Sequence, residues 1–127
     1  MALLQELLDR APEITALRRD IHAHPELCFE EIRTADLVAR QLEGWGIAVH
    51  RGLGRTGVVG TIHGRDGGAS GRAVGLRADM DALPMQEFNT FEHASRHAGK
   101  MHACGHDGHV AMPVSYTHLT LPTIYSV

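Results

Sequence analysis

The hydrophobic residues change their spacing once along the chain, and this change constrains the fold more than any other feature. Up to Gly44, apolar side chains recur at helical intervals, as Ile14, Leu17 and Ile21 do. From Ile47 onwards they occur in short runs bounded by glycine, which are typical of strands. Helices followed by strands predict a layered domain of the α/β or α+β class.

The helical part contains three periodic segments. Leucines at 3–8 share one face of a short helix, and a second helical pattern begins near Pro12, where a first turn tolerates proline. We expect this pattern to end at HAHPEL, 22–27, because proline disfavours helix in the residue before it. A further helix is predicted over 29–44. Its expected buried stripe is Ile32, Ala35, Ala39 and Leu42.

Three short strands are expected in the middle of the chain, at 47–50, 57–64 and 73–79. The glycine-rich stretch at 65–71 predicts a hairpin or a surface loop. The stretch GLGRTG, 52–57, lacks the glycine spacing and the lysine of a phosphate-binding loop, so we interpret it as a turn.

The composition excludes several classes of protein. The net charge is −3 and the basic residues are scattered, so neither nucleic acid nor a membrane surface is an expected partner. No apolar stretch approaches the roughly 20 residues of a membrane helix, and Glu6 and Asp9 argue against a signal peptide. Two cysteines are too few for a disulfide scaffold, so we expect a reducing, cytoplasmic location.

The segment MHACGHDGH, 101–109, concentrates histidine, cysteine and aspartate in one place. Cys104 and His106 are two residues apart, so in an extended segment both side chains point the same way and can bind one metal ion. A thiolate with an imidazole suits zinc and similar ions better than magnesium or calcium. His102 has the same parity and can join them.

The rest of this segment leaves two interpretations open. If a helix begins near Asp107, that residue can cap it and His109 lies in its first turn. No second cysteine or histidine pair at zinc-finger spacing is present, which argues against a closed structural zinc site. The site is then either an open catalytic one that other segments complete, or a small non-catalytic zinc-binding module. The module would use His102, Cys104, His106 and His109 as its complete ligand set.

A second polar motif, RADMDALP at 77–84, follows the last predicted strand. Ligands of α/β sheets bind at the carboxyl ends of strands. Asp79 and Asp81 are two residues apart, so both carboxylates can face one side. The simpler alternative is a charged strand end in water.

Four stretches together resemble the N-terminal part of metal-dependent amidohydrolases of the aminoacylase, hippurate hydrolase and indoleacetyl-amino-acid hydrolase type. Their order and spacing also fit that family, and they span nearly everything up to Met112. The stretches are LRRDIHAHPELCFEE (17–31), RTGVVGTI (55–62), LRADMDALPMQE (76–87) and HASRHAGKMHACGHDGHVAM (93–112).

The resemblance implies roles for individual residues. Cys104 and His106 would be ligands of a binuclear metal centre, and Asp81 would support catalysis by orienting a ligand or the catalytic glutamate. His109 and Asp107 would be supporting or helix-capping residues. The role of Asp79 stays open, and HAHPEL would pack near the site without chemistry of its own.

The resemblance also implies an α/β fold, the N-terminal part of a zinc-peptidase-like catalytic domain with helices packed on a mixed, largely parallel sheet. The implied reaction is hydrolysis of the amide bond of N-acyl amino acids, with two divalent ions (zinc, manganese, nickel or cobalt) and a glutamate as general base. The implied partner is a small-molecule substrate, and the parent enzyme would be a homodimer or larger homo-oligomer.

The chain departs from this family after the cluster. The catalytic Glu-Glu pair and the remaining ligands lie downstream in the family, but no glutamate follows Glu92 here, and Glu30-Glu31 stands in the wrong place. We therefore expect this chain to be an inactive fragment. The stretch PVSYTHLTLPTIYSV, 113–127, resembles a translated sequencing adaptor. We thus divide the chain into a metallohydrolase part, 1–112, and a non-native tail, 113–127.

Overall fold

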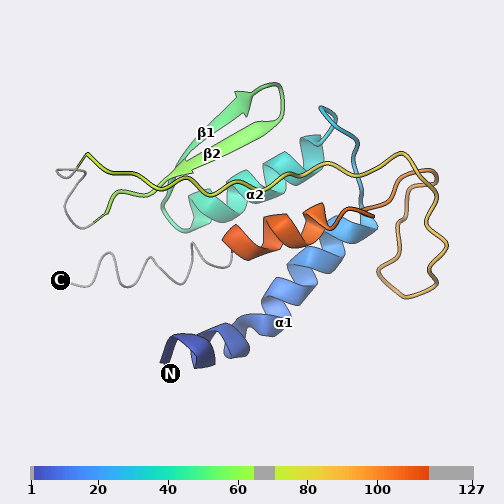
Figure 1. Ribbon diagram of the computed structural model, residues 1–127, viewed down its shortest axis with the longest axis horizontal. Coiled ribbons are helices and arrows are strands. Elements are labelled where there is room, and N and C mark those ends of the chain that lie inside the picture. Colours follow the sequence, from blue (N-terminus) through green and yellow to red (C-terminus); the bar gives the residue numbers. More distant parts are fainter. Residues whose placement is uncertain (1, 65–70, 115–127) are drawn as a thin grey trace.

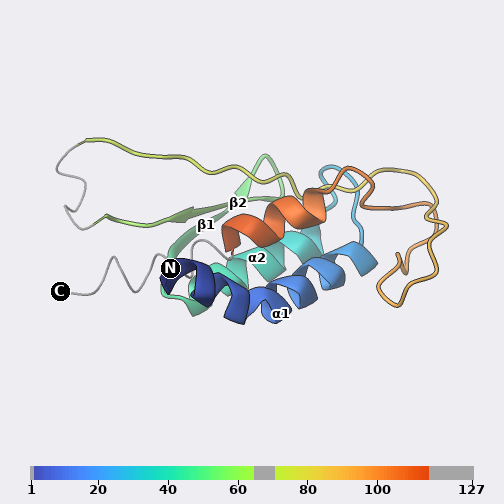
Figure 2. The same cartoon turned by 60° about the horizontal axis from the view of Figure 1, so that its bottom comes forward.

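The computed structural model describes residues 2–64 and 71–114, which form helices and one hairpin (Figure 1). Helix α1 spans Ala2–Ala23 and helix α2 spans Ile32–Gly44. A further helix covers 106–114, the last described residues. It packs beside α1 and α2 in both views, and the hairpin lies beyond α2 (Figure 2). Helices layered with a small sheet confirm the predicted α/β class.

Helix α1 is continuous through Pro12, so the predicted restart at that residue is wrong. An internal proline removes one backbone hydrogen bond, at about 3 kcal/mol, but the turns on either side remain intact. The predicted end at HAHPEL is confirmed, since α1 stops at Ala23. Pro25, which follows, is fully buried.

Helix α2 begins at Ile32 and not at Phe29, because the φ of Phe29 is 64°, in the left-handed region. Of the predicted buried stripe, Ala39 is fully buried, but Ile32 is 68% exposed. Thr34 is buried in its place. The carboxylate of Glu26 accepts hydrogen bonds from the Thr34 N–H and hydroxyl, each at 2.8 Å. A tertiary contact therefore decides which face of α2 turns inward.

Strands β1 (Ala48–Leu53) and β2 (Gly57–Thr61) pair antiparallel and confirm the first two predicted strands. The stretch between them is a turn, as predicted, with an irregularity in register between Arg51 and Leu53. Gly57 is required here, because a Cβ at this position would lie 2.4 Å from the Leu53 carbonyl oxygen. Arg51 links the hairpin to α2 through its ion pairs with Asp36 and Glu43.

The third predicted strand, at 73–79, is not formed. A strand needs a neighbour for its backbone hydrogen bonds, and among the described residues this stretch has none. Val74 is 90% exposed and Leu76 64% exposed as a result. The described sheet is thus the antiparallel hairpin, without the parallel strands that the sequence led us to expect. The predicted loop at 65–71 lies almost wholly outside the described residues.

The core lies where α1, α2 and the helix at 106–114 meet. Its buried members are Ile21 of α1 with Val110 and Val114 of the last helix. Partly buried side chains from α1, α2 and the extended segment surround them: Leu17, Leu37, Val38, Trp45, Ala78 and Met80. This packing fixes the last helix, which begins directly after the cysteine–histidine cluster, against α1.

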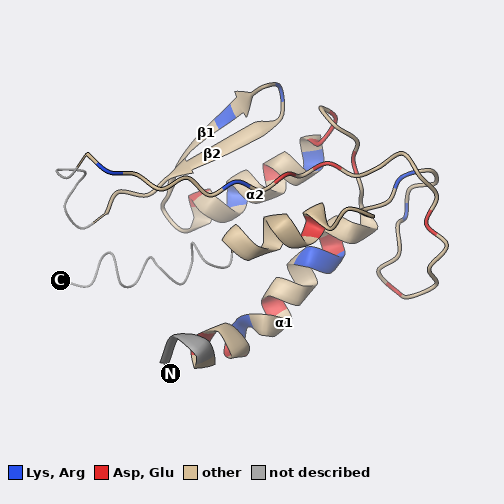
Figure 3. Ribbon diagram, viewed as in Figure 1, with Lys and Arg blue, Asp and Glu red and all other residues tan. Residues whose placement is uncertain are grey.

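Basic and acidic positions are interspersed along the ribbon of the described chain (Figure 3). This agrees with the scattered basic residues of the sequence. Within the described part of the chain, no helix is long and apolar enough to cross a membrane.

Candidate functional site

His106 and Asp81 form the pair on which the candidate site is built. The His106 Nδ1 lies 2.9 Å from both the carboxylate Oδ1 and the main-chain oxygen of Asp81. Both acceptors call for a proton on Nδ1, which leaves Nε2 with its lone pair free for a metal ion. The His106 side chain is mostly buried, so its ring is held in one orientation.

Cys104 stands two residues before this histidine, with an exposed free thiol. Between them Gly105 adopts a φ of +81°, a left-handed conformation that glycine takes without steric cost. Its carbonyl oxygen accepts the N–H groups of Gly108 and His109 in the first turn of the helix. The predicted helix start near Asp107 is thereby confirmed, one residue earlier than expected.

The other residues of the cluster lie in different surroundings. The ring of His109 stacks on His106 with centroids 5.3 Å apart. Asp107 is the second residue of the helix and not the residue before it, so its predicted capping role is wrong. Asp79 accepts a hydrogen bond from Arg77 at 2.9 Å.

His102 is buried, and neither of its ring nitrogens has a hydrogen-bond partner within the described structure. Burial lowers the pKa of His102, although the nearby Asp107 acts in the opposite direction. His102 is buried, whereas the thiol of Cys104 is exposed, and no three such donors are placed together among the described residues. The four-residue zinc module therefore finds no support in this geometry.

The donor set is partial. Across residues 2–64 and 71–114, no three histidine, cysteine, aspartate or glutamate side chains are placed to hold a metal ion together. The chemistry of Cys104 and His106, a thiol and an oriented imidazole, nevertheless fits zinc or a similar borderline ion. These two residues could thus supply part of a metal site that other donors complete.

Sequence reasoning missed a buried polar network beside this site. The ring of His22, on α1, lies between two carboxylates, with Nδ1 at 3.0 Å from Asp107 and Nε2 at 3.1 Å from Glu87. Arg18, one turn earlier on α1, donates a second hydrogen bond to Asp107 at 3.0 Å. One feature of the sequence could have indicated this network. Arg18 and His22 are four residues apart, so they share one face of the helix, next to the apolar Leu17 and Ile21. Nothing in the sequence pointed to Glu87.

Glu87 is ionised within this network. Burial alone would raise its pKa, but hydrogen bonds from Asn89, the Ser95 N–H and His22 outweigh burial, so the pKa of Glu87 is lowered. Asn89 Nδ2 donates at 2.8 Å, and the Ser95 N–H binds the other carboxylate oxygen. The network therefore anchors the irregular segment at 87–95 to α1.

The HAHPEL segment packs near the site, as expected, and it also organises the chain around it. Glu26 binds the N–H groups at the start of α2. Leu27 forms a parallel bridge with Ala82, next to Asp81. Cys28 is exposed, and desolvation followed by the charges of Asp81 and Glu31 raises the pKa of its thiol. This motif thus joins both helices to the segment that holds His106.

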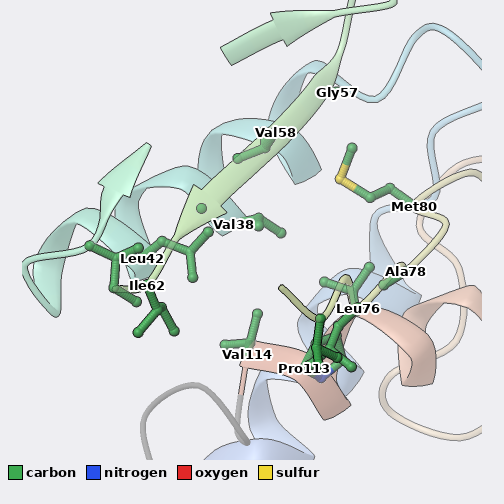
Figure 4. A pocket seen from close by; sticks show the side chains of 14 residues that line it. Val38, Leu42, Gly57, Val58, Ile62, Leu76, Ala78, Met80, Pro113 and Val114 are labelled. Carbon is green, nitrogen blue, oxygen red and sulfur yellow. The ribbon is translucent and has the colours of Figure 1, made fainter. Parts of the chain in front are cut away.

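An apolar cavity of about 330 Å³ lies between α2, β2, the extended segment and the last helix (Figure 4). Leu42, Val58 and Met80 are among its lining side chains. No titratable side chain lines it, so it is not the place where the polar chemistry of the site would occur.

The comparisons with known proteins agree with this geometry. Residues 75–120 match the sequence profile of peptidase family M20/M25/M40. The chain is 48% identical over 109 residues to a hippurate hydrolase from Campylobacter jejuni, covering 86% of this chain and 28% of that protein. The chain is a relative of the M20 family. The resemblance inferred from the sequence motifs is confirmed.

Further relatives extend the agreement from sequence to structure. An N-acyl-L-amino acid amidohydrolase from Geobacillus stearothermophilus is 48% identical over 110 residues, which cover 86% of this chain and 29% of that protein. A crystal structure described as a dinuclear metal-binding M20 peptidase from Bacillus subtilis superposes with a TM-score of 0.76 at 37% identity. It covers 89% of this chain, which corresponds to 31% of that structure. This M20 relative therefore spans somewhat under a third of the proteins it matches.

A second solved structure supports the same fold. A putative aminohydrolase from methicillin-resistant Staphylococcus aureus has a TM-score of 0.81 at 34% identity, over 94% of this chain and 31% of that structure. The fold of the described residues is thus that of the corresponding part of M20 proteins.

Proposed function

We propose that this M20 relative is part of a metal-dependent amidohydrolase that cleaves N-acyl amino acids, with Cys104 and His106 as metal ligands. The observation that carries the proposal is the hydrogen-bonded pair of His106 and Asp81, which presents the free Nε2 in a sequence related to M20 hydrolases. The names of the relatives, hippurate hydrolase and N-acyl-L-amino acid amidohydrolase, support the substrate class.

The residues of this chain would have separate tasks. Two bound divalent ions, of zinc, manganese, nickel or cobalt, would supply Lewis acidity toward the acyl carbonyl and an acidified water. His106 would donate its Nε2 and Cys104 its thiolate, while Asp81 keeps the imidazole in the correct tautomer. The name of the Bacillus subtilis structure, dinuclear metal-binding peptidase, supports the count of two ions.

The 127-residue chain by itself would be inactive in this proposal. A general base is needed to move the proton of the attacking water. Glu31, half of the one adjacent glutamate pair, is buried and accepts a hydrogen bond from the Thr56 hydroxyl at 2.6 Å. Its carboxylate is thus engaged by Thr56, and we do not assign it the role of general base. The general base and the metal ligands act together, so the loss of the base removes most of the catalysis.

The boundary of the native sequence is part of the same proposal. We assign 1–112 to the metallohydrolase and 113–127 to a translated adaptor. The match to the family profile extends to residue 120, past this boundary, so similarity does not decide the matter. Sequencing the source DNA would decide where the native sequence ends.

We further propose that the parent protein works in the cytoplasm, on a small-molecule substrate, as a homodimer or larger homo-oligomer. The two free cysteines, both exposed, support a reducing compartment. Partners such as nucleic acid or membrane are not part of the proposal, since the net charge is −3 and basic and acidic positions are interspersed along the described chain.

The test begins with the source DNA. Sequencing across the codon of Met112 with independent primers should show an open frame that continues into a Glu-Glu pair and further histidines. The product of that frame should release free amine from N-acyl amino acids when supplied with Mn²⁺ or Zn²⁺, whereas the 127-residue chain should not. A genomic stop after Val127, or turnover by the 127-residue chain well above blank, would refute the proposal.

A further inference from the structure

We propose that His22 is a positioning residue of the candidate site: its ring, hydrogen-bonded on both sides between Asp107 and Glu87, fixes the start of the helix that carries His106. The role of His106 as a metal donor rests on the proposed function. The positioning itself rests only on the geometry of the described residues.

The ring of His22 joins three segments that are distant in sequence. Asp107 is 85 residues away at the start of the last helix, and Glu87 is 65 residues away in the irregular loop. All three side chains are buried, with Asp107 at 1% and Glu87 at 7% exposed. A link of this kind, made away from water, orders the groups it joins more firmly than a surface contact does.

Both ring nitrogens of His22 face carboxylate groups. An ionised carboxylate only accepts hydrogen bonds, and an imidazole donates from both nitrogens only when it is protonated. His22 faces Asp107 on one side and Glu87 on the other, while His93 and His102 lie beside it with ring centroids 5.7 and 6.3 Å away. Arg18 also donates a hydrogen bond to Asp107 and adds a positive charge there.

The start of the last helix is held from two directions. Asp107 ties it to α1 through Arg18 and His22, and the adjacent His106 ties it to the main chain and side chain of Asp81. The preceding Gly105 has no Cβ and nothing lies within 4 Å of where one would be, so packing does not fix this turn. Together with the packing of Val110 and Val114 on Ile21, these polar contacts position the ring of His106.

The first measurement is the ¹⁵N spectrum of the histidine rings in the unsubstituted chain, without metal. His106 should show a proton on Nδ1 that exchanges slowly with water, because two oxygens of Asp81 accept it. Fast exchange of this proton in the unsubstituted chain would overturn the proposal. This measurement uses the unsubstituted chain, so it does not require that any variant folds.

The second measurement compares His22→Phe with a matched control, Thr56→Val. The control removes a buried hydrogen bond, from Thr56 to Glu31, that is not part of this network. Exchange of the His106 Nδ1 proton should be faster by about tenfold or more in His22→Phe, and unchanged in Thr56→Val at matched global stability. Equal exchange in the two variants would show a merely structural role and refute the proposal.

A conservative variant separates packing from hydrogen bonding. His22→Gln keeps a donor for one carboxylate but not for both, so its effect on the His106 proton should fall between the unsubstituted chain and His22→Phe. A result as severe as that of His22→Phe would contradict the two-sided link. None of these readouts involves metal, so a failure of Cys104 and His106 to bind metal would refute the proposed function alone.

Discussion

Replacing Asp81 with alanine should weaken metal binding through His106 without abolishing it. Asp81 contributes two acceptors to the same Nδ1–H, its carboxylate and its main-chain oxygen, each at 2.9 Å. The substitution removes the first and keeps the second. The tautomer that leaves Nε2 free should therefore persist, while the added basicity from the carboxylate is lost.

The size of the effect follows from this arrangement. Losing a partner that orients a metal ligand costs about 10- to 100-fold in affinity. Because the carbonyl survives in Asp81→Ala, we expect the lower end, about tenfold, or roughly 1.4 kcal/mol. His106→Ala, which removes the donor itself, should cost more than Asp81→Ala.

The assay is zinc affinity by competition with a chromophoric chelator, on the 127-residue chain at neutral pH. Asp79→Ala is the matched control, because Asp79 is bound to Arg77 and should leave the affinity unchanged. If Asp81→Ala binds zinc as the unsubstituted chain does, or if it loses as much as His106→Ala, the reasoning about the two acceptors is wrong.

Three further predictions concern stability. Glu26→Ala removes the hydrogen bonds to the start of α2 and leaves the buried hydroxyl of Thr34 without its acceptor, so urea unfolding should show a loss of about 2–4 kcal/mol. Val110→Ala deletes two buried methyl groups packed on Ile21 and should cost about 2 kcal/mol by the same measurement. The pKa of Glu87 is lowered from its usual 4.5, so its contribution to stability should be complete above that pH and lost as the pH falls through the lower folded value. Glu87→Gln should flatten this part of the acid-unfolding profile, and an unchanged profile would exclude the contribution.

The sequence pattern correctly predicted those elements that depend only on residues close to them in the chain. The end of α2 at Gly44 and the turn at 52–57 follow from glycine in the sequence. The exposure of Ile32 and the burial of Thr34 could not be predicted, because a carboxylate eight residues before Thr34 decides which side of the helix is buried. The strand expected at 73–79 has the right composition but lacks a neighbour among the described residues.

The candidate site likewise contains some residues that the sequence predicted and one that it did not. Cys104 and His106 were predicted as ligands because their types and spacing are visible in the sequence, and the resemblance implied a supporting role for Asp81, which is hydrogen-bonded to His106. The role of His22 was not found, because it arises from contacts across 65 and 85 residues that no local pattern shows.

The central claim is that Cys104 and His106 bind one metal ion together, and cobalt absorption tests it most directly. Titration of the 127-residue chain with Co²⁺ should produce a thiolate-to-cobalt charge-transfer band that is lost in Cys104→Ser and weakened in His106→Ala. The band should persist in Cys28→Ser, since the raised pKa of the Cys28 thiol disfavours its thiolate form. No band in the unsubstituted chain, or a band that depends on Cys28 and not on Cys104, would contradict the account.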